Sequence, residues 1–343
     1  HEIWVAPVWW GLAVVRMAGM TAASATLHAP SPPFDSGWLP VSGGHRLYYE
    51  QRGAPAGIPV LILHGGPGSG CSPLMAGFFS PEHYRLVLLD QRGAGKSRPA
   101  GCCEENTTPA LIDDIEVLRR HLAIDRWLVM GGSWGATLGL LYAAAQPAQL
   151  SGLLLRNPFL ARAADLDWFF GGARQYHPDA WQGWAALGAP EAPGAMLPWL
   201  ADCFCNSLPS ALAAHVAAWH VWECALARTP NRSLTPADIE LLQLRYSLQL
   251  HYFRQACFIP AGGVLAAAEC IAAANVPIHV VQGLADHVCP ASATTVLLEK
   301  LPNAGCTWVE DVGHDPYHPA MQAATLQLAD AFIRLDGSWP EQR

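Results

Sequence analysis

The sequence has little charge, and few of its side chains are basic. Charged residues make up 14% of the 343 residues, and 20 Lys and Arg against 28 Asp and Glu give a formal net charge of −8. The basic residues do not cluster into a stripe, which argues against an electrostatic surface for nucleic acid or for an anionic membrane. We therefore expect a small substrate, with no nucleic-acid partner and no membrane partner.

The sequence also lacks a dense cysteine framework. Its ten cysteines are scattered along the chain, and neither Cys102-Cys103 nor Cys203-x-Cys205 has a second Cys/His pair at the spacing of a structural zinc site. Such a scatter in a large chain is unlike that of a secreted domain held together by disulfides. We expect mostly reduced and buried thiols, no metal, and a cytoplasmic protein.

An export signal is not evident at the start of the chain. The apolar run 4–15 is too short to span a bilayer comfortably, Glu2 precedes it where Lys or Arg would be expected, and Arg16 follows it. An overlong start or a truncated fragment explains this segment better than an export signal does. We expect residues 1–35 to form an N-terminal extension outside the fold.

What is present is the composition of a globular protein. Hydrophobic residues make up 51% of the chain, and 31 Gly and 28 Pro are spread along it without a repeat. From Gly37 onward, short apolar segments alternate with helical patterns, which is typical of βαβ units on a largely parallel sheet. Several segments are continuous apolar runs, as in strands buried on both faces. The predicted strands are 46–51, 59–64, 85–90, 127–131, 152–156, 278–282 and 306–310.

The stretch 157–271 interrupts this alternation. It is rich in Ala and Trp and has no convincing strand, and the βαβ pattern resumes at Val276. We predict one α/β core formed by residues 36–156 and 272–343, with a helical cap inserted at 157–271. Such a cap would cover the carboxyl edge of the sheet, where open α/β sheets bind their ligands.

The sharpest motif is Gly131-Gly132-Ser133-Trp134-Gly135. It follows a predicted strand and precedes the helical run 136–145. In that context G-x-S-x-G indicates a nucleophile elbow, a tight turn that exposes the Ser133 hydroxyl above the sheet and needs small residues beside it. The alternative is an ordinary turn between a strand and a helix.

A serine hydroxyl needs a base and an orienting carboxylate to act as a nucleophile, and in this arrangement the acid and then the histidine follow the serine. Asp286 follows strand 278–282, and His314 follows strand 306–310. Both residues therefore lie on loops at the edge where Ser133 emerges. The competing candidates are His287 and His318 for the base, and Asp311 and Asp315 for the acid.

A glycine-rich loop, His64-Gly65-Gly66-Pro67-Gly68-Ser69-Gly70, follows another predicted strand. Glycines allow backbone N–H groups to face a ligand without interference from a Cβ atom. We predict that an N–H of Gly65 or Gly66, together with that of Trp134, holds the oxyanion of a tetrahedral intermediate. A phosphate-binding loop is disfavoured, because no Gly-Lys-Ser/Thr follows and the proline removes one donor.

Taken together, these motifs resemble those of the proline iminopeptidase family of α/β hydrolases, over nearly the whole stretch 37–335. The resemblance implies the α/β-hydrolase fold, with a mostly parallel central sheet, flanking helices and an inserted helical cap. The agreement extends well beyond the elbow and follows the family's order. The matching motifs are His64-Gly65-Gly66-Pro67-Gly68, Asp90-Gln91-Arg92-Gly93-x-Gly95-x-Ser97, Asn106-Thr107-Thr108, Gly131-Gly132-Ser133-Trp134-Gly135, Trp222-Glu223, His251-Tyr252-Phe253 and Gly313-His314.

The resemblance implies release of an N-terminal residue, preferably proline, from small peptides or amides, with Ser133 as nucleophile, Asp286 as orienting acid and His314 as base. It also implies that carboxylates of the cap bind the free α-amine of the substrate, and Glu223 matches the first of them. A carboxylate in a water-poor pocket would pair with the substrate ammonium. The alternative for Glu223 is a solvated residue on a helix.

The sequence departs from the family in features that bear on specificity. Gln249 stands where the family tends to carry a second glutamate of the cap; an amide still accepts a hydrogen bond but brings no charge. The acid loop reads Gly283-Leu284-Ala285-Asp286, without the usual Arg-Tyr before the aspartate. Arg156-Asn157-Pro158-Phe159 replaces a stretch that typically reads Arg-Gly-Ile-Phe. We expect the core chemistry to be intact, whereas the choice of substrate stays open.

The sequence thus predicts a serine hydrolase that works through an acyl-enzyme and needs no metal or organic cofactor. One alternative keeps the same three residues but makes the protein a carboxylesterase, amidase or lactonase with an altered cap, because one fold hosts many chemistries. Another alternative is a catalytically silent hydrolase fold that binds a ligand or a partner.

Overall fold

The computed structural model describes residues 26–335 and Trp339. Within them, one eight-stranded sheet has the order β1-β2-β4-β3-β5-β6-β7-β8. β2 is antiparallel to both of its neighbours, β1 and β4, and every other neighbouring pair is parallel. The strands are β1 (Asp35–Pro40), β2 (Arg46–Gly53), β3 (Ile58–Leu63), β4 (Tyr84–Leu89), β5 (Trp127–Gly132), β6 (Leu150–Arg156), β7 (Ile278–Gly283) and β8 (Gly305–Val309).

Each predicted strand is present, and its bounds differ from the prediction by one or two residues at an end. β5 shows why a continuous apolar run predicts a strand that is buried on both faces of the sheet. Trp127 and Val129 belong to the core on one face of the sheet, and Leu128 and Met130 belong to the core on the other. β1 was not predicted, because it is an edge strand whose buried side chain is Leu39, so it carries no apolar run.

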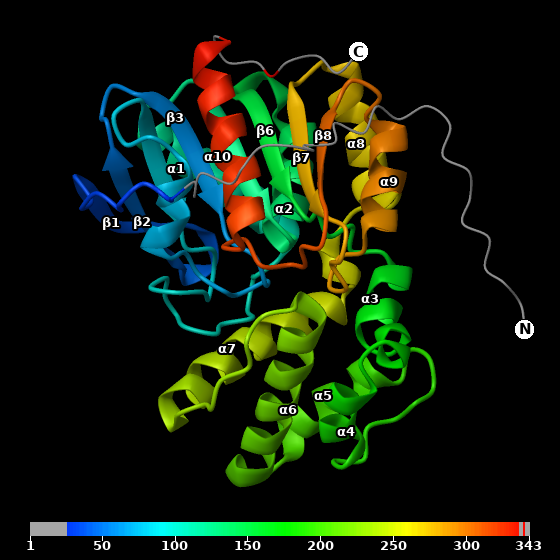
Figure 1. Ribbon diagram of the computed structural model, residues 1–343. Helices are drawn as coiled ribbons and strands as arrows, with labels where there is room; N and C mark the ends of the chain where they lie inside the picture. The colour runs from blue at the N-terminus through cyan, green and yellow to red at the C-terminus, as the bar shows by residue number, and fades with distance from the viewer. Residues whose placement is uncertain (1–25, 336–338, 340–343) are drawn as a thin grey trace, which may run out of the picture.

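Helices cover both faces of the sheet (Figure 1). α1, α2, α8 and α9 contribute to the core on one face, and α10 with the short helix η2 contributes to the core on the other. The helices of this sheet domain are η1 (Ser42–Gly44), η2 (Pro73–Phe78), α1 (Thr108–His121), α2 (Trp134–Ala145), η3 (Pro147–Gln149), α8 (Gly263–Ala273), α9 (Ala291–Lys300) and α10 (Pro319–Arg334).

After β6 the chain forms a helical cap beside the carboxyl edge of the sheet, below the sheet domain in Figure 1. Its interior is filled by indole rings: Trp184 packs against Trp181, Trp219 and Trp222 with ring centroids 5.5, 6.2 and 5.6 Å apart. The helices of the cap are α3 (Ala163–Phe169), η4 (Gly172–Gln175), α4 (Pro178–Ala185), α5 (Met196–Asn206), α6 (Pro209–Ala227), α7 (Pro236–Phe253) and η5 (Ala256–Phe258).

The structure differs from the predicted end of the cap at residue 271. α8 packs against α2 and α9 of the sheet domain, where Val264, Ala268 and Ile271 are buried. It therefore belongs to the core, and the cap ends before it. The segment Ala256–Ala273 has the length and hydropathy of a membrane span. In this fold, however, its helix lies against the helices that cover the sheet.

The structure also differs from the extension predicted for residues 1–35. The apolar run 4–15 lies outside the described residues. From residue 26 onward the chain lies against the sheet domain: Leu27 packs on the core beneath α10, and the His28 N–H donates to a backbone carbonyl of η2 at 2.9 Å. The last part of the expected extension is thus part of the fold, and β1 begins within it.

A buried ion pair fastens the loop after β4 to α1. The Arg92 guanidinium donates through Nε and Nη2 to the two carboxylate oxygens of Asp114, at 2.7 and 2.8 Å. The Arg92 side chain is fully buried and that of Asp114 is 3% exposed. Removal of one partner from such a pair leaves an uncompensated buried charge.

We predict that Asp114→Ala lowers the free energy of unfolding by about 3 kcal/mol, because it leaves Arg92 buried and unpaired. Asp113→Ala is the matched control on the same helix: Asp113 is exposed, and its loss is expected to change stability by less than about 0.5 kcal/mol. Urea denaturation followed by circular dichroism measures both variants. Equal losses for the two would show that the Arg92–Asp114 pair does not stabilise the fold.

Candidate active site

Ser133 lies at the turn between β5 and α2, with φ 55° and ψ −122°. A non-glycine residue rarely adopts a positive φ, and the surrounding structure must hold it there. The flanking glycines explain how the turn fits: a Cβ atom on Gly131 would lie 2.2 Å from the Gly135 carbonyl oxygen, and one on Gly135 would lie 2.3 Å from the Leu63 carbonyl oxygen. The turn therefore has the tight geometry that the motif predicts.

Asp286 and His314 meet at the carboxyl edge of the sheet, on the loops after β7 and β8. His314 Nδ1 lies 2.6 Å from Asp286 Oδ2. The other carboxylate oxygen accepts the backbone N–H groups of Val288 and Cys289, at 2.8 and 2.9 Å. Asp286 is buried, so these bonds fix the carboxylate in place and aim it at the imidazole.

The competing candidates have other partners. His287 Nδ1 lies 2.7 Å from Nε2 of His177, on the cap, and His318 caps the N-terminus of α10. Asp315 accepts a backbone N–H of its own loop, and Asp311 is exposed. The structure therefore joins His314 to Asp286 and to neither Asp311 nor Asp315.

Ser133 and His314 line one cavity of about 430 Å³. Within residues 26–335, however, the hydrogen bonds include none between the Ser133 hydroxyl and the His314 imidazole; Oγ instead lies 3.9 Å from the Cys289 Sγ. Burial raises the pKa of the Cys289 thiol well above its usual value, which keeps this neighbour protonated. The structure thus shows the predicted contact between imidazole and carboxylate but not the one between imidazole and hydroxyl. Contacts of the latter kind often form only with substrate bound.

The glycine-rich loop lies against the elbow. A Cβ atom on Gly65 would lie 3.6 Å from the Ser133 Cβ, and Gly66 has φ 116°. In the described part of the chain, the backbone N–H groups of Gly65, Gly66 and Trp134 donate to no other residue. Because Trp134 is the first residue of α2, its N–H has no acceptor within the helix. These donors are thus available to a ligand next to Ser133.

Gln91 connects this loop to Trp134. Its backbone N–H donates to His64 Nε2 at 3.0 Å, and its side-chain amide donates to the His64 carbonyl at 2.9 Å. Its Oε1 accepts the Trp134 indole N–H at 2.9 Å. Burial lowers the pKa of His64, and the neutral ring with its proton on Nδ1 satisfies both contacts of the imidazole, the second being the Gly65 carbonyl. Gln91 belongs to a motif that is visible in the sequence, but nothing in that motif indicates these contacts.

Asn157 connects the loops that carry the acid and the base. Its Oδ1 accepts the Gly283 N–H at 2.8 Å, and its Nδ2 donates to the Gly313 carbonyl at 3.3 Å. Gly283 ends the strand before Asp286, and Gly313 directly precedes His314. In the sequence, Asn157 stands out only as part of a departure from the family. Its position directly after a buried strand, at the edge that carries the site, was the available signal.

The cap contributes Glu223 from α6 and Gln249 from α7 to the same cavity. Glu223 Oε1 lies 2.6 Å from Arg245 Nη2, and Oε2 accepts the Tyr246 hydroxyl at 3.1 Å. Arg245 also lines the cavity and was missed from the sequence. No group of three or more His, Cys, Asp and Glu side chains in the described ranges is placed to hold a metal ion.

Comparison with known proteins identifies the family. The α/β hydrolase fold family matches residues 58–196. A proline iminopeptidase from Arabidopsis thaliana is 42% identical over 321 residues, which cover 91% of this chain and 83% of that protein. A probable proline iminopeptidase from Leptolyngbya boryana is 38% identical over 311 residues, which cover 90% and 97% of the two chains.

Solved structures show the same fold. A proline iminopeptidase from Mycobacterium smegmatis matches with a TM-score of 0.57 and 18% identity, over 88% of this chain and 100% of that one. An esterase from a Rhodococcus species matches with a TM-score of 0.57 and 17% identity, over 88% and 98% of the two chains. At such low identity these structures support the fold alone. The predicted fold and family are confirmed: this chain has the α/β-hydrolase fold and belongs to the proline iminopeptidase family.

Proposed function

We propose that this protein is a serine hydrolase that releases an N-terminal residue, preferentially proline, from small peptides or amides. The observation that carries the proposal is the 2.6 Å contact between His314 and Asp286 at a cavity that the Ser133 elbow also lines. Membership of the proline iminopeptidase family supports the choice of substrate. Cytoplasmic residence stays a prediction.

In the proposed reaction, Ser133 Oγ attacks the carbonyl carbon of the N-terminal residue while His314 Nε2 takes the hydroxyl proton. Asp286 holds the other ring N–H and stabilises the imidazolium that forms. The oxyanion accepts hydrogen bonds from the N–H of Trp134 and from that of Gly65 or Gly66. His314 then returns the proton to the leaving amine, and water, activated in the same way, hydrolyses the acyl-enzyme.

Two further residues act through their neighbours. Gln91 holds the glycine-rich loop and Trp134 in one arrangement, which fixes the spacing of the oxyanion donors. Asn157 holds the ends of the acid and base loops together. We propose both as positioning residues, because rate depends steeply on how accurately the reacting groups are placed.

The cap would bind the N-terminal residue of the substrate. The cavity wall beyond Ser133 includes apolar side chains such as Phe159, Phe169 and Phe253, which suit a pyrrolidine ring. Glu223 is the proposed partner of the substrate ammonium, and Gln249 provides a neutral hydrogen-bonding group on the neighbouring helix.

We predict that Ser133→Ala lowers kcat for L-prolyl p-nitroanilide by on the order of 10⁴-fold to 10⁶-fold, because it removes the nucleophile. Ser292→Ala, at an exposed position of α9, is the matched control and is expected to keep the rate within about twofold. A fluorophosphonate probe should label the wild type and the control but not Ser133→Ala. A near-normal rate in Ser133→Ala would rule out the proposed nucleophile.

Asn157→Ala is expected to lower kcat by on the order of tenfold to 100-fold with a smaller change in KM, since it releases the acid and base loops from each other. Phosphonylation by the fluorophosphonate should slow in parallel, because that step needs the activated serine but no group of the cap. Asn303→Ala, in an exposed loop, controls for loss of an asparagine. An unchanged phosphonylation rate in Asn157→Ala would show that Asn157 positions nothing in the site.

A further inference from the structure

The charged side chains that line the cavity balance one another. They are two carboxylates, Glu223 and Asp315, and two guanidinium groups, Arg156 and Arg245. Burial lowers the pKa of His220, a further residue of the lining, which favours its neutral form near pH 7. Among the described residues that line the cavity there is therefore no excess negative charge with which to select a cationic substrate; the Asp286 carboxylate lies behind His314, outside this lining.

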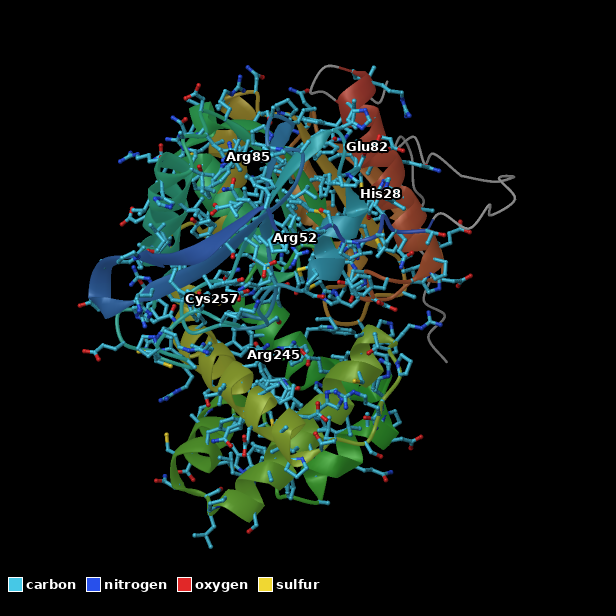
Figure 2. The ribbon with its side chains drawn as sticks, turned by 90° about the vertical axis from the view of Figure 1, so that its left-hand side faces the viewer. His28, Arg52, Glu82, Arg85, Arg245 and Cys257 are labelled. Carbon is cyan, nitrogen blue, oxygen red and sulfur yellow. The ribbon has the colours of Figure 1, made fainter. Side chains whose placement is uncertain are left out.

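Glu223, the carboxylate proposed to meet the substrate amine, is already hydrogen-bonded to Arg245 and Tyr246. Arg245 donates to one oxygen of Glu223 at 2.6 Å, and Tyr246 donates to the other at 3.1 Å. Figure 2 shows Arg245 on the side of the cap that faces the sheet domain. Burial is the largest single influence on the pKa of Arg245 and lowers it, but Glu223, together with Tyr246 and Cys224, raises the pKa above its usual value, so the guanidinium stays charged.

Gln249 offers a neutral group one helical turn beyond Arg245. It is 3% exposed and lines the cavity. Its amide makes no hydrogen bond to any other side chain or backbone group that the structure describes, so both ends of the amide are available to a ligand. A substrate ammonium here would meet an uncharged amide, a carboxylate each of whose oxygens already accepts one hydrogen bond, and a guanidinium that repels it.

We propose that Arg245 is a specificity-determining residue that neutralises Glu223, so that the cap recognises the terminal group by shape more than by charge. The inference rests on the proposed function and widens its substrate class, because it assigns the Glu223 carboxylate to Arg245 in place of the substrate ammonium. The enzyme accepts amides and esters of small cyclic or apolar acyl groups, whether or not those groups carry a protonated α-amine. Arg245 acts by competing with the substrate ammonium for the Glu223 carboxylate.

A matched pair of substrates isolates the effect of the positive charge on the acyl group. L-Prolyl and cyclopentanecarbonyl p-nitroanilide have the same ring size, and the ring NH₂⁺ of the first is a CH₂ group in the second. We compare kcat/KM at pH 7 after dividing each value by the hydroxide-catalysed rate of the same anilide, which corrects for intrinsic reactivity. The proposal predicts that the wild type prefers the prolyl group by less than about tenfold. A preference above about 100-fold would overturn it.

Variants of Arg245 and Glu223 test whether this ion pair sets the preference for the prolyl group. Arg245→Gln should raise the prolyl preference by about tenfold or more, because it frees a carboxylate for a charge-assisted bond. Arg245→Lys, which keeps the positive charge, should stay near the wild-type preference. Glu223→Gln should lower the preference by leaving Arg245 unpaired, and the Glu223→Gln/Arg245→Gln double variant should return toward the wild type. A fall in prolyl preference in Arg245→Gln would mean that Arg245 orients Glu223 for the ammonium, which contradicts the proposal.

A binding measurement tests this inference independently of the proposed reaction. If the wild type hydrolyses neither acyl group as an anilide or as a p-nitrophenyl ester, the proposed function fails, but the charge preference can still be measured. Calorimetric titration of Ser133→Ala with L-prolinamide and with cyclopentanecarboxamide compares the same two rings without turnover. Dissociation constants within about tenfold support the proposal, and a preference for L-prolinamide above about 100-fold overturns it.

Discussion

At the carboxyl edge of the sheet, the buried carboxylate of Asp286 accepts two backbone N–H groups and faces His314 Nδ1. A buried carboxylate is costly unless its oxygens are hydrogen-bonded. These bonds therefore hold the loop after β7 in one conformation and, through the imidazole, hold the loop after β8 as well. Asn157 links the same two loops at their base. The orientation of the proposed base toward Ser133 depends on this small network.

Local signals in the sequence were sufficient for much of this arrangement. β5 is buried on both faces and therefore reads as an apolar run, and the elbow needs glycines at fixed positions around Ser133. The features that were missed depend on contacts between distant segments. β1 is defined by its pairing with β2, and α8 is assigned to the core by its packing on α2. No pattern within one segment reveals such contacts.

The contacts of the site that could not be predicted from the sequence also join distant segments. Glu223 could be singled out from its motif, but its pairing with Arg245 joins two helices of the cap and has no signature in either one. That pairing changes the electrostatics of the cavity, because the Arg245 guanidinium pairs with the Glu223 carboxylate, which the family resemblance assigns to the substrate amine. Family membership thus establishes the fold, while the charge balance at the far end of the cavity depends on the pairing of Glu223 with Arg245.

In the proposed reaction, Ser133 carries the acyl group during turnover. The covalent intermediate can be located directly by rapid mixing of the enzyme with p-nitrophenyl cyclopentanecarboxylate. The reaction is quenched with acid, and the acylated peptide is identified by mass spectrometry. We expect one cyclopentanecarbonyl group on the peptide that contains Ser133. An acyl group on the neighbouring thiol of Cys289, or turnover with no acylated peptide at any time, would contradict it.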